Sequence, residues 1–585
     1  MPKICLTIND RPVEVEAGAT ILEAARSARV NIPTLCHIEG LEPTGSCRIC
    51  SVEVEGRDNL VPSCAEPAVD GMSVRTNSPR VLTARRYMIQ LLLANHPDDC
   101  LYCARGGECD LQDLAQDVGI RERAWRRGRH RSHPVDRSSP SVVRDPEKCI
   151  LCGKCVRVCG EIQGVSAIDH AGRGFDSFVL PAFDDDLAST ICVNCGQCVA
   201  ICPTGALVER NDLARVRHFL SDESLVTVVQ TAPAVRAALA WAYGLSGREA
   251  EAKMVTALRE MGFSYVFDTQ YAADLTIMEE SAELLSRIRE DGPLPLITSC
   301  SPGWIKFAEH FYPEHLDKLS TCKSPQQMLG AMVKNYWAET RGISPERIRL
   351  VSVMPCTAKK FEAERPEMET SQGRDVDAVI TTRELLSAFA EMGLDFAEVD
   401  EGEFDAFLGA SSGAGAIFGT TGGVAEAALR TVYHLLTGEN PGPNDFSAVR
   451  GPEGIKEIEI TLPEGDSIRG AVVHGLGNAR RVMDAVSSGE SDYAFVEIMA
   501  CPGGCVGGGG QPYGADRERT AKLAAELYEI DETRAVRFSH ENEEVLRAYR
   551  DYLDSPGGAK SHRLLHTTYR PRPRYRAEED EALIG

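Results

Sequence analysis

The pattern of apolar and polar positions changes character along the chain. Near the start, residues 4–8 and 13–15 form two strand-like runs on either side of the turn signal Asn9-Asp10, which predicts a β-hairpin. Thr20 and Glu23 have the spacing of a capping box, so we expect a helix over residues 21–29. A further helical stretch lies around residues 85–94. The front of the chain is therefore expected to mix strands and helices in small α+β units.

The rear two thirds follow a different pattern. Short β-branched runs alternate with helical stretches, which is typical of an α/β domain. The run at 376–382 leads directly into a helix expected over 383–392, and another expected over 542–553 packs on the same domain. The tail at 569–576 is expected to be an exposed, extended end. The expected strands are residues 225–229, 265–267, 296–298, 350–353, 378–381 and 495–498.

Composition narrows the class of protein. The 585 residues predict roughly three to six domains, and a hydrophobic content of 43% suffices for sizeable cores. A net charge of -24 excludes a general nucleic-acid binder, which needs a basic face. The apolar stretch at 225–245 contains Gln230, Pro233 and Arg236, so it is not a membrane span. No signal peptide precedes the first strand, and we expect the protein in the cytoplasm.

The 21 cysteines are the unusual quantity, and sixteen of them lie before residue 203. A reducing cytosol disfavours disulfides, and clustered spacing favours metal. Four thiols, Cys36, Cys47, Cys50 and Cys64, suit a [2Fe–2S] cluster, with zinc as the alternative that uses the same ligands. Their spacing resembles the ferredoxin-like domain that opens large respiratory-chain and hydrogenase subunits.

A histidine precedes the next group of cysteines. His96 stands four residues before Cys100, and Cys103 and Cys109 follow. A histidine in this position is more often a ligand than a surface residue, and the set predicts a [4Fe–4S] cluster held by one imidazole and three thiolates, again with zinc as the alternative. The basic residues after 121 predict a solvated linker, and a docking patch for an acidic partner is the second interpretation.

Two four-cysteine runs then repeat the pattern of a two-cluster ferredoxin. In such folds the fourth cysteine of each run binds the other cluster. One [4Fe–4S] cluster is therefore expected on Cys149, Cys152, Cys155 and Cys202, and a second on Cys192, Cys195, Cys198 and Cys159. Clusters in series imply the transport of single electrons to or from another site.

Most of the rear cysteines follow predicted strands, where open α/β sheets bind cofactors. They lie in three local motifs, residues 298–304 (TSCSPGW), 354–360 (MPCTAKK) and 497–512 (EIMACPGGCVGGGGQP). Together these motifs resemble the three signature loops of the [FeFe]-hydrogenases, and the resemblance extends over nearly the whole chain. In that family the loops bind the H-cluster, a cubane [4Fe–4S] cluster joined through a thiolate to a two-iron unit with CO, cyanide and a bridging amine-dithiolate.

The resemblance assigns roles to individual residues. It implies that Cys356, Cys501 and Cys505 hold the cubane, that Cys505 bridges to the two-iron unit, and that Lys359 donates a hydrogen bond to a cyanide ligand. An isolated buried ammonium is costly, so we expect an anionic partner for Lys359. The residues matching the family's pocket wall are Ala232, Pro233, Pro325, Gln326, Met354, Phe418 and Met499.

The first loop departs from the family, which commonly has two adjacent cysteines there. This chain has Cys300 followed by Ser301, and by spacing Ser301 occupies the ligand position and Cys300 the proton-relay position. Either Cys300 shifts to bind the cubane and Ser301 relays protons, or Ser301 binds through oxygen and Cys300 keeps the relay role. Because iron in such clusters prefers thiolate, we favour Cys300 as the ligand.

The family's proton relay also has counterparts. Glu280 and Glu283 lie three apart on one helical face, and with Arg287 and Ser320 they match the relay positions. Cys5 is expected in the core, and Cys322 is expected to be structural and near the relay. The glycine-rich segment 413–419 misses the dinucleotide-binding spacing, so we expect a packing loop and no NAD or flavin on this chain.

The resemblance implies a multidomain α+β and α/β chain. Expected are a β-grasp [2Fe–2S] domain (1–79), a one-histidine/three-cysteine [4Fe–4S] domain (80–120), a linker (121–139), a two-[4Fe–4S] ferredoxin domain (140–211), a two-lobed α/β H-cluster domain (212–512) and a small-subunit-like helical segment with a tail (513–585). The cofactors would be one [2Fe–2S] cluster, three accessory [4Fe–4S] clusters and the H-cluster.

The implied activity is reversible hydrogen oxidation and proton reduction. The modular form resembles the hydrogenase subunit of NAD(P)-linked, possibly electron-bifurcating complexes, with flavin- and NAD(P)-binding and thioredoxin-like [2Fe–2S] partners. A stand-alone ferredoxin-linked hydrogenase, a non-turnover hydrogen sensor and a cluster-assembly protein remain alternatives. The large subunit of a respiratory NADH dehydrogenase or formate dehydrogenase shares the front modules, but the three rear loops argue against it.

Overall fold

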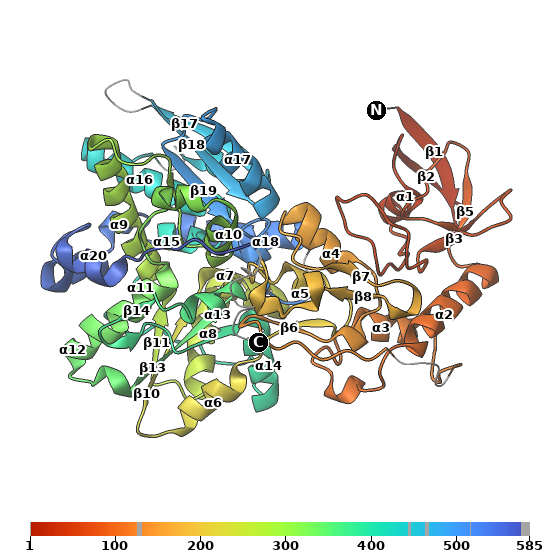
Figure 1. The fold of residues 1–585 in the computed structure, drawn as a ribbon, viewed down its shortest axis with the longest axis horizontal. Coiled ribbons are helices and arrows are strands. Elements are labelled where there is room, and N and C mark those ends of the chain that lie inside the picture. The colour runs from red at the N-terminus through yellow and green to blue at the C-terminus, as the bar shows by residue number, and fades with distance from the viewer. Residues whose placement is uncertain (1, 126–130, 443–445, 462–466, 515, 575–585) are drawn as a thin grey trace, which may run out of the picture.

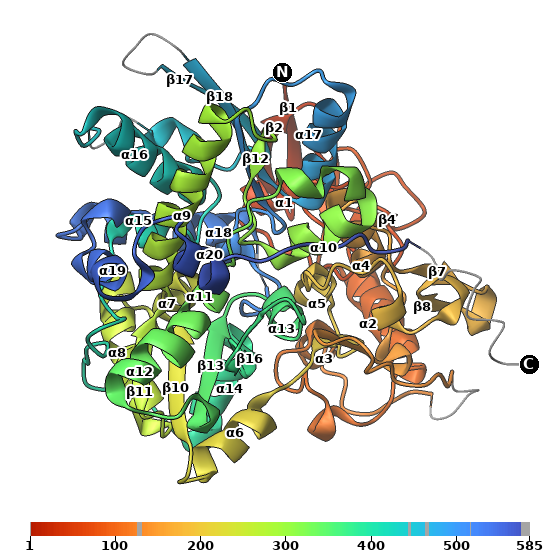
Figure 2. The ribbon, with the colours of Figure 1, turned by 60° about the vertical axis from the view of Figure 1, so that its left-hand side comes forward.

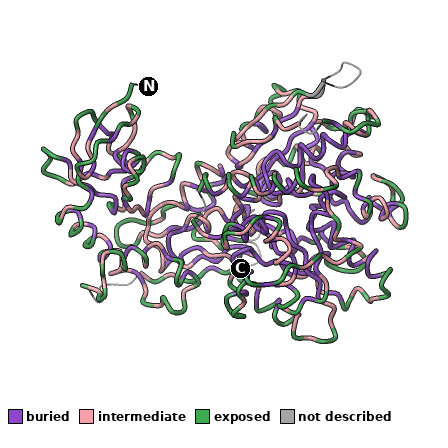
Figure 3. Tube along the Cα trace, turned by 180° about the vertical axis from the view of Figure 1, so that it is seen from behind, coloured by how far each residue is buried: buried purple, intermediate pink, exposed green. Residues whose placement is uncertain are grey.

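In the computed structural model the modules follow one another along the long axis of the molecule. The structure describes residues 2–125, 131–442, 446–461, 467–514 and 516–574. Figure 1 shows the N-terminal sheet at one end, the cysteine-rich helices in the middle and the large α/β body at the other end. Buried positions concentrate in the large body, whereas much of the N-terminal unit is exposed or half-buried (Figure 3).

The N-terminal unit is a five-stranded sheet with one short helix. Its strands lie in the order β2-β1-β5-β3-β4, and the capping box predicted at Thr20 and Glu23 is confirmed. Leu6 and Ile8 of β1 point into the core, so Cys5, at an odd position of the same strand, faces solvent. The prediction that Cys5 lies in the core is wrong for this reason. The elements are β1 (Lys3–Ile8), β2 (Arg11–Glu16), α1 (Ile21–Ser27), β3 (Ser51–Val54), β4 (Val61–Pro62) and β5 (Ser73–Arg75).

The next helix, α2 (Pro79–Ala94), begins earlier than expected, because Ser78 caps it and Pro79 occupies its first turn. Part of the expected linker is packed structure. Asp136 accepts hydrogen bonds from the backbone of Ser138 and Leu187, and Ser139 is buried; residues 126–130 lie outside the described residues. The elements here are α3 (Asp110–Asp117), β6 (Val142–Arg144), α4 (Lys154–Arg157), β7 (Asp169–Ala171), β8 (Phe178–Leu180), α5 (Gln197–Ile201) and β9 (Leu207–Glu209).

Two four-stranded sheets form the large body. The first has the order β11-β10-β13-β16 and is wholly parallel; the second has the order β12-β19-β18-β17, with β17 antiparallel at the edge. The six predicted strands appear within a few residues of their expected bounds, but β17 and β18 were missed. The strands are β10 (Val226–Thr231), β11 (Tyr265–Asp268), β12 (Leu296–Ile297), β13 (Ile348–Met354), β14 (Glu369–Thr370), β15 (Gly373–Arg374), β16 (Ala378–Thr381), β17 (Ile455–Thr461), β18 (Ser467–His474) and β19 (Phe495–Met499).

Helix α9 (Thr269–Arg289) connects the two sheets, since it follows β11 and precedes β12 (Figure 2). It is buried over most of its length and packs against α11 and α16. The other helices of the body are α6 (Leu213–Ser221), α7 (Pro233–Tyr243), α8 (Gly247–Glu260), α10 (Pro302–Phe311), α11 (Pro325–Met332), α12 (Ala338–Arg341), α13 (Ala358–Ala363), α14 (Thr382–Met392), α15 (Gly413–Ile417), α16 (Gly423–Thr437), α17 (Leu476–Ser488), α18 (Arg517–Thr533), α19 (Glu543–Ala548) and α20 (Ala559–Leu565).

The glycine-rich segment 413–419 packs closely as expected, but it contains helix α15 instead of a loop. Ser412 caps this helix, and a Cβ added at Gly415 would be 2.8 Å from the carbonyl oxygen of Gln270. The described part of the C-terminal tail is extended and mostly exposed, as expected, and Arg572 ties it to the body by pairing with the buried Glu309 at 2.6 Å. Within the described residues, every helix is too short or too polar to cross a membrane.

Candidate active site

A cavity between the two sheets collects four of the five rear cysteines, all except Cys322. Each reaches it from the carboxyl end of a strand: Cys300 and Ser301 after β12, Cys356 after β13, and Cys501 and Cys505 after β19. The space between its walls, including the part open to solvent, is about 820 Å³. Every residue expected in the pocket wall also lines it, namely Ala232, Pro233, Pro325, Gln326, Met354, Phe418 and Met499.

Glycines bring the backbone of the last loop close to its neighbours. A Cβ at Gly508 would lie 2.2 Å from the carbonyl oxygen of Pro355, and one at Gly509 would lie 2.3 Å from that of Cys195. Any larger residue would push the cysteine loops apart. The Cys501–Gly510 loop is therefore packed backbone-to-backbone against both the Cys356 loop and the cysteine-rich middle module.

Lys359 has the anionic partner that its burial requires. Its ammonium lies 3.0 Å from a Glu362 carboxylate oxygen and donates a hydrogen bond of 3.0 Å to the carbonyl oxygen of Cys300. Glu362 is itself buried and accepts further hydrogen bonds from Ser324 and Gln326. The expected ion pair is confirmed, although Glu362 was not identified from the sequence. Its spacing of three residues from Lys359 on a helix was the available signal.

The cavity suits an iron–sulfur group by its donor set. Burial, together with the neighbouring Cys356 thiol, raises the pKa of Cys505 to about 12. Burial likewise raises the pKa of Cys356 and Cys501. A bound metal ion would lower these pKa values again, because a cation stabilises the thiolate that ligates it. Three thiols gathered with little solvent and a close glycine backbone thus fit a cluster with iron at its corners.

A line of acidic and hydroxyl groups leads away from the cavity. Glu280 on α9 is buried, which raises its pKa to about 8, and its Oε2 has no hydrogen-bond partner among the described residues. The Ser320 hydroxyl donates to Glu283 at 3.1 Å, and Glu283 pairs with Arg287 at 2.6 Å. Glu283 is half-buried, so the line runs from the interior toward the surface.

Glu279, one residue before Glu280, belongs to a different network. Its carboxylate accepts hydrogen bonds from Tyr549 at 2.6 Å and from the backbone of Gly557 at 2.7 Å, and pairs with His566 at 3.0 Å. These contacts attach the C-terminal helices to α9. Cys322 is buried beside Glu283, with Sγ 3.8 Å from its carboxylate, consistent with the expectation of a structural cysteine near the relay.

Sequence reasoning assigned no role to Glu497, which lies in the last loop motif. It is fully buried, and burial raises its pKa to about 7. Its carboxylate accepts hydrogen bonds from the backbone of Gly422 at 2.6 Å and Ala425 at 2.7 Å, at the N-terminus of α16. The helix dipole and these donors favour its charged form. The residue anchors α16 to β19, next to the cavity.

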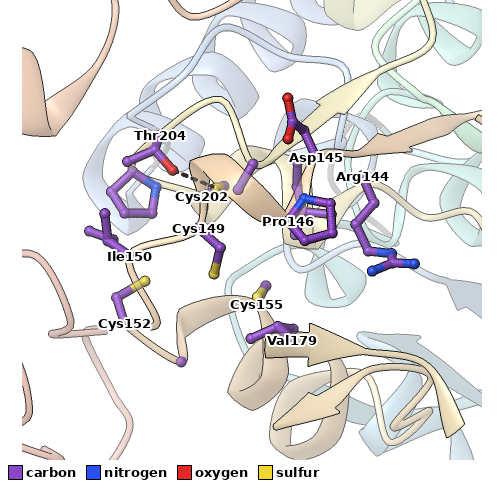
Figure 4. Close-up of a pocket in the computed structure, with 14 residues that line it drawn as sticks. Arg144, Asp145, Pro146, Cys149, Ile150, Cys152, Cys155, Val179, Cys202 and Thr204 are labelled. Carbon is purple, nitrogen blue, oxygen red and sulfur yellow. Dashed lines mark hydrogen bonds between the residues drawn. The ribbon is translucent and has the colours of Figure 1, made fainter. Parts of the chain in front are cut away.

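The middle module brings its cysteines together in crossed sets. Cys149, Cys152, Cys155 and Cys202 line one small cavity, although Cys202 comes from the other run (Figure 4). The second set, Cys159, Cys192, Cys195 and Cys198, lies on the side of the active-site cavity: Cys195 lines that cavity, and burial and the neighbouring Cys501 thiol raise the pKa of Cys195. Two thiol sets and the active site are therefore contiguous.

The two front sites are less uniform. Sγ of Cys50 lies 3.4 Å from Sγ of Cys64, and a hydrogen bond from Cys47 lowers the pKa of Cys36 to about 4, so these four thiols form pairs. At the predicted site of His96, the thiol of Cys109 is buried, whereas that of Cys103 is half-buried.

His96 is oriented as a ligand would be. It is buried, its Nδ1 lies 3.1 Å from the carbonyl oxygen of Pro97, and its Nε2 has no hydrogen-bond partner within the described part of the chain. A bond from Nδ1 to a carbonyl sets the tautomer that leaves Nε2 free to bind metal. Cys100 is exposed, and its carbonyl oxygen accepts a hydrogen bond of 3.4 Å from the backbone N–H of Cys103, which keeps the two residues on one turn.

Known protein families match successive parts of this chain, in the same order as the modules described above. Residues 226–509 match the iron only hydrogenase large subunit, C-terminal domain, and residues 517–572 match the iron hydrogenase small subunit. The front matches a 2Fe-2S iron-sulfur cluster binding domain (2–79), the NADH-ubiquinone oxidoreductase-G iron-sulfur binding region (85–124) and the NADH-quinone oxidoreductase subunit 3 ferredoxin-like domain (139–208).

One full-length relative decides the family. NADP-reducing hydrogenase subunit HndD of Solidesulfovibrio fructosivorans is 49% identical, over 98% of this chain and 100% of the relative. The chain belongs to the [FeFe]-hydrogenases. Iron hydrogenase 1 of Clostridium pasteurianum is 38% identical over 97% of this chain and 99% of its own. A solved structure of the [FeFe]-hydrogenase HydA1 from Chlamydomonas reinhardtii superposes with a TM-score of 0.56 at 43% identity, covering 62% of this hydrogenase and all of that chain.

Proposed function

We propose that this [FeFe]-hydrogenase catalyses reversible hydrogen oxidation and proton reduction as the hydrogenase subunit of an NAD(P)-linked complex. One observation carries the proposal: the cavity lined by Cys356, Cys501 and Cys505 is contiguous, through Cys195, with the thiols of a two-cluster ferredoxin module. A redox site fed by single-electron carriers fits the activation of hydrogen, which exchanges two electrons and two protons.

The ligand assignments follow from the gathered thiols and from the resemblance of the loops to the family. Cys356, Cys501 and Cys505 would hold the cubane of the H-cluster, and Cys505 would also join it to the two-iron unit. That unit would supply the open iron site for the activation of hydrogen. The Lys359 ammonium, held by Glu362, would donate a hydrogen bond to a cyanide ligand of the unit. Met354, Phe418 and Met499 exclude water, while Ala232, Pro233, Pro325 and Gln326 shape the remaining wall.

The accessory clusters form the electron route. One [2Fe–2S] cluster occupies Cys36, Cys47, Cys50 and Cys64, and one [4Fe–4S] cluster occupies His96, Cys100, Cys103 and Cys109. Two more occupy the crossed sets of the ferredoxin module, of which Figure 4 shows the set of Cys149, Cys152, Cys155 and Cys202. The domain division expected at residues 79, 120, 139, 211 and 512 is supported by the limits of the five matched families.

Protons reach the cavity through chain residues. Glu283 takes them up at the surface end, the Ser320 hydroxyl passes them on, and Glu280 delivers them toward Cys300. The raised pKa of Glu280, about 8, keeps its carboxyl protonated near neutral pH, as a donor to a reduced site needs to be. Arg287 positions Glu283 and does not itself carry protons.

The partners are hydrogen, protons and other electron-transfer proteins. The full-length similarity to an NADP-reducing hydrogenase subunit supports a flavin- and NAD(P)-binding subunit and a thioredoxin-like [2Fe–2S] subunit, with ferredoxin as a further carrier. Electron bifurcation by such an assembly is the extended form of the proposal. A stand-alone ferredoxin-linked enzyme would show full turnover with ferredoxin and none with NADP.

A hydrogen-evolution assay with a reduced dye tests the activity directly, on full-length protein carrying all accessory clusters and matured with the two-iron unit. Continuous hydrogen evolution supports the proposal. Full cluster loading without turnover overturns it and favours a sensor or cluster-assembly role. The relay groups argue against a sensor, because Glu283, Ser320 and Arg287 remain hydrogen-bonded in one line.

A further inference from the structure

The adjacent residues Cys300 and Ser301 meet different surroundings. Ser301 has extended backbone angles (φ -101°, ψ 99°), and side chains of consecutive extended residues point to opposite sides. Only one of the two can therefore face the corner of the cavity opposite Cys356, Cys501 and Cys505. The question is which donor atom completes that corner.

The Cys300 side chain packs on the α9 side of the cavity. The apolar cluster that it joins contains Ile277 of α9, the helix that also carries Glu280, together with Phe418 and Met499. Its carbonyl oxygen is held by Lys359 at 3.0 Å, which fixes the peptide of this residue. Moving the thiol to the opposite side would require that hydrogen bond and the packing to break.

The Ser301 hydroxyl points to the loop of Cys501. Ser301 is the N-cap of α10, a position where serine normally accepts a hydrogen bond from its own helix, yet its side chain makes no such bond. Its Oγ instead accepts from the backbone N–H of Ala500 at 3.2 Å, one residue before Cys501. The oxygen is therefore turned away from its own helix and toward a cubane-binding loop.

The same turn is pressed against the ferredoxin module. A Cβ added at Gly303 would lie 3.1 Å from Cβ of Ala500 and 3.7 Å from Cβ of Cys195. Ser301 thus stands where the loop of Cys501 and the last thiols of the electron route converge, whereas Cys300 stands at the end of the proton route.

From this placement we infer that Ser301 Oγ binds the fourth iron of the cubane and that Cys300 stays a free thiol. The inference rests on the proposed function. It reverses the preference for Cys300 that the chemistry of iron alone suggested. Formation of the iron–oxygen bond breaks the Ser301 O–H bond, and its proton passes to the thiolate or hydroxide that the oxygen displaces from the iron; no electron moves. An alkoxide is a harder donor than a thiolate, so it favours the oxidised cubane.

Three variants of the full-length protein test this inference through the spectrum of the cubane. In Ser301→Ala, the cubane loses its fourth iron on mild oxidation, seen as the loss of about one iron per chain and a new three-iron EPR signal relative to wild type. Ser301→Cys keeps all four irons and shifts the cubane potential to a more positive value. Cys300→Ala is the matched variant, and its cubane keeps the iron content, EPR spectrum and potential of wild type.

A structure of the matured wild-type protein provides the direct comparison. Ser301 Oγ bonded to iron supports the inference. Cys300 Sγ bonded to iron overturns it, as does loss of the fourth iron in Cys300→Ala but not in Ser301→Ala. The proposed function is tested separately. If the matured protein has iron bound to Ser301 but evolves no hydrogen, this ligand assignment stands and the proposed enzyme activity is refuted.

Discussion

Replacing Glu280 by glutamine separates the proton route from every other property of the active site. The side chain is 2% exposed and its Oε2 makes no hydrogen bond among the described residues, so the isosteric amide breaks no ion pair. What it removes is an exchangeable proton between Ser320 and Cys300. General acid–base groups contribute about 10² to 10⁴ in rate. We expect Glu280→Gln to slow hydrogen evolution by about this factor with unchanged iron content.

The pKa of Glu280 adds a test by pH. With a pKa of about 8, the carboxyl is about 90% protonated at pH 7 and loses about tenfold in proton occupancy per unit well above pH 8. Hydrogen evolution at constant driving force should therefore decline above pH 8. The same raised pKa affects folding: the stability contributed by the protonated carboxyl is fully present below pH 4.5, its ordinary value, and is lost as pH rises to about 8.

The assay measures dye-driven hydrogen evolution from pH 6 to pH 9, a range of about three pH units that extends to both sides of the pKa of Glu280. Thermal denaturation measures the stability of each variant. Glu290→Gln is the matched control, because Glu290 is the exposed C-cap of the same helix, α9. Turnover of Glu280→Gln within twofold of the control, about 0.4 kcal/mol in barrier, would refute the route through Glu280.

Three further variants address the other parts of the molecule. His96→Cys should lower the midpoint potential of the front [4Fe–4S] cluster, measured by EPR-monitored redox titration, because imidazole ligation raises cluster potentials. Glu362→Gln leaves the buried Lys359 ammonium without its anion and should reduce the free energy of unfolding by about 3–5 kcal/mol in urea denaturation. Gly509→Ala places a methyl group 2.3 Å from the carbonyl oxygen of Cys195 and should slow reduction of the cubane by the ferredoxin module in stopped-flow measurements.

Each of these has a matched comparison. His133→Cys changes a histidine that packs on Phe178 and Asp184 and should leave the cluster potential unchanged. Glu369→Gln removes a carboxylate from a solvent-exposed ion pair and should cost at most about 1 kcal/mol. Gly160→Ala meets only the Ser166 hydroxyl at 3.3 Å. Equal effects in a variant and its comparison would contradict the role assigned.

Local rules account for what the sequence determined about this hydrogenase. Cysteine spacing identified the two ferredoxin runs, since ligands to one cluster must come from one turn and its partner run. The capping box at Thr20 placed helix α1, and the alternation in the rear part placed β10, β11, β12, β13, β16 and β19 within a few residues. The three loop motifs carried the resemblance to the family because their residue types are dictated by the cofactor.

Tertiary structure decided what depends on the direction of a side chain. Cys5 lies in a strand as predicted, but which face of the sheet it occupies is set by Leu6 and Ile8 packing inward. Glu279 and Glu280 are neighbours in sequence, yet helical geometry sends one to His566 and the other toward Ser320. The strands β17 and β18 were missed because their pairing stabilises them despite Gly470: β18 pairs with β19, and β17 pairs with β18.

The first loop shows the same division most sharply. Spacing alone left Cys300 and Ser301 as alternative ligands, and the intrinsic preference of iron pointed to the thiol. The hydrogen bonds from Lys359 to the Cys300 carbonyl oxygen and from Ala500 to the Ser301 hydroxyl come from loops more than fifty residues away in the chain, and the inferred assignment of the two donors rests on them. Such long-range contacts leave no local pattern in the sequence, so only the folded chain decides between the two donors.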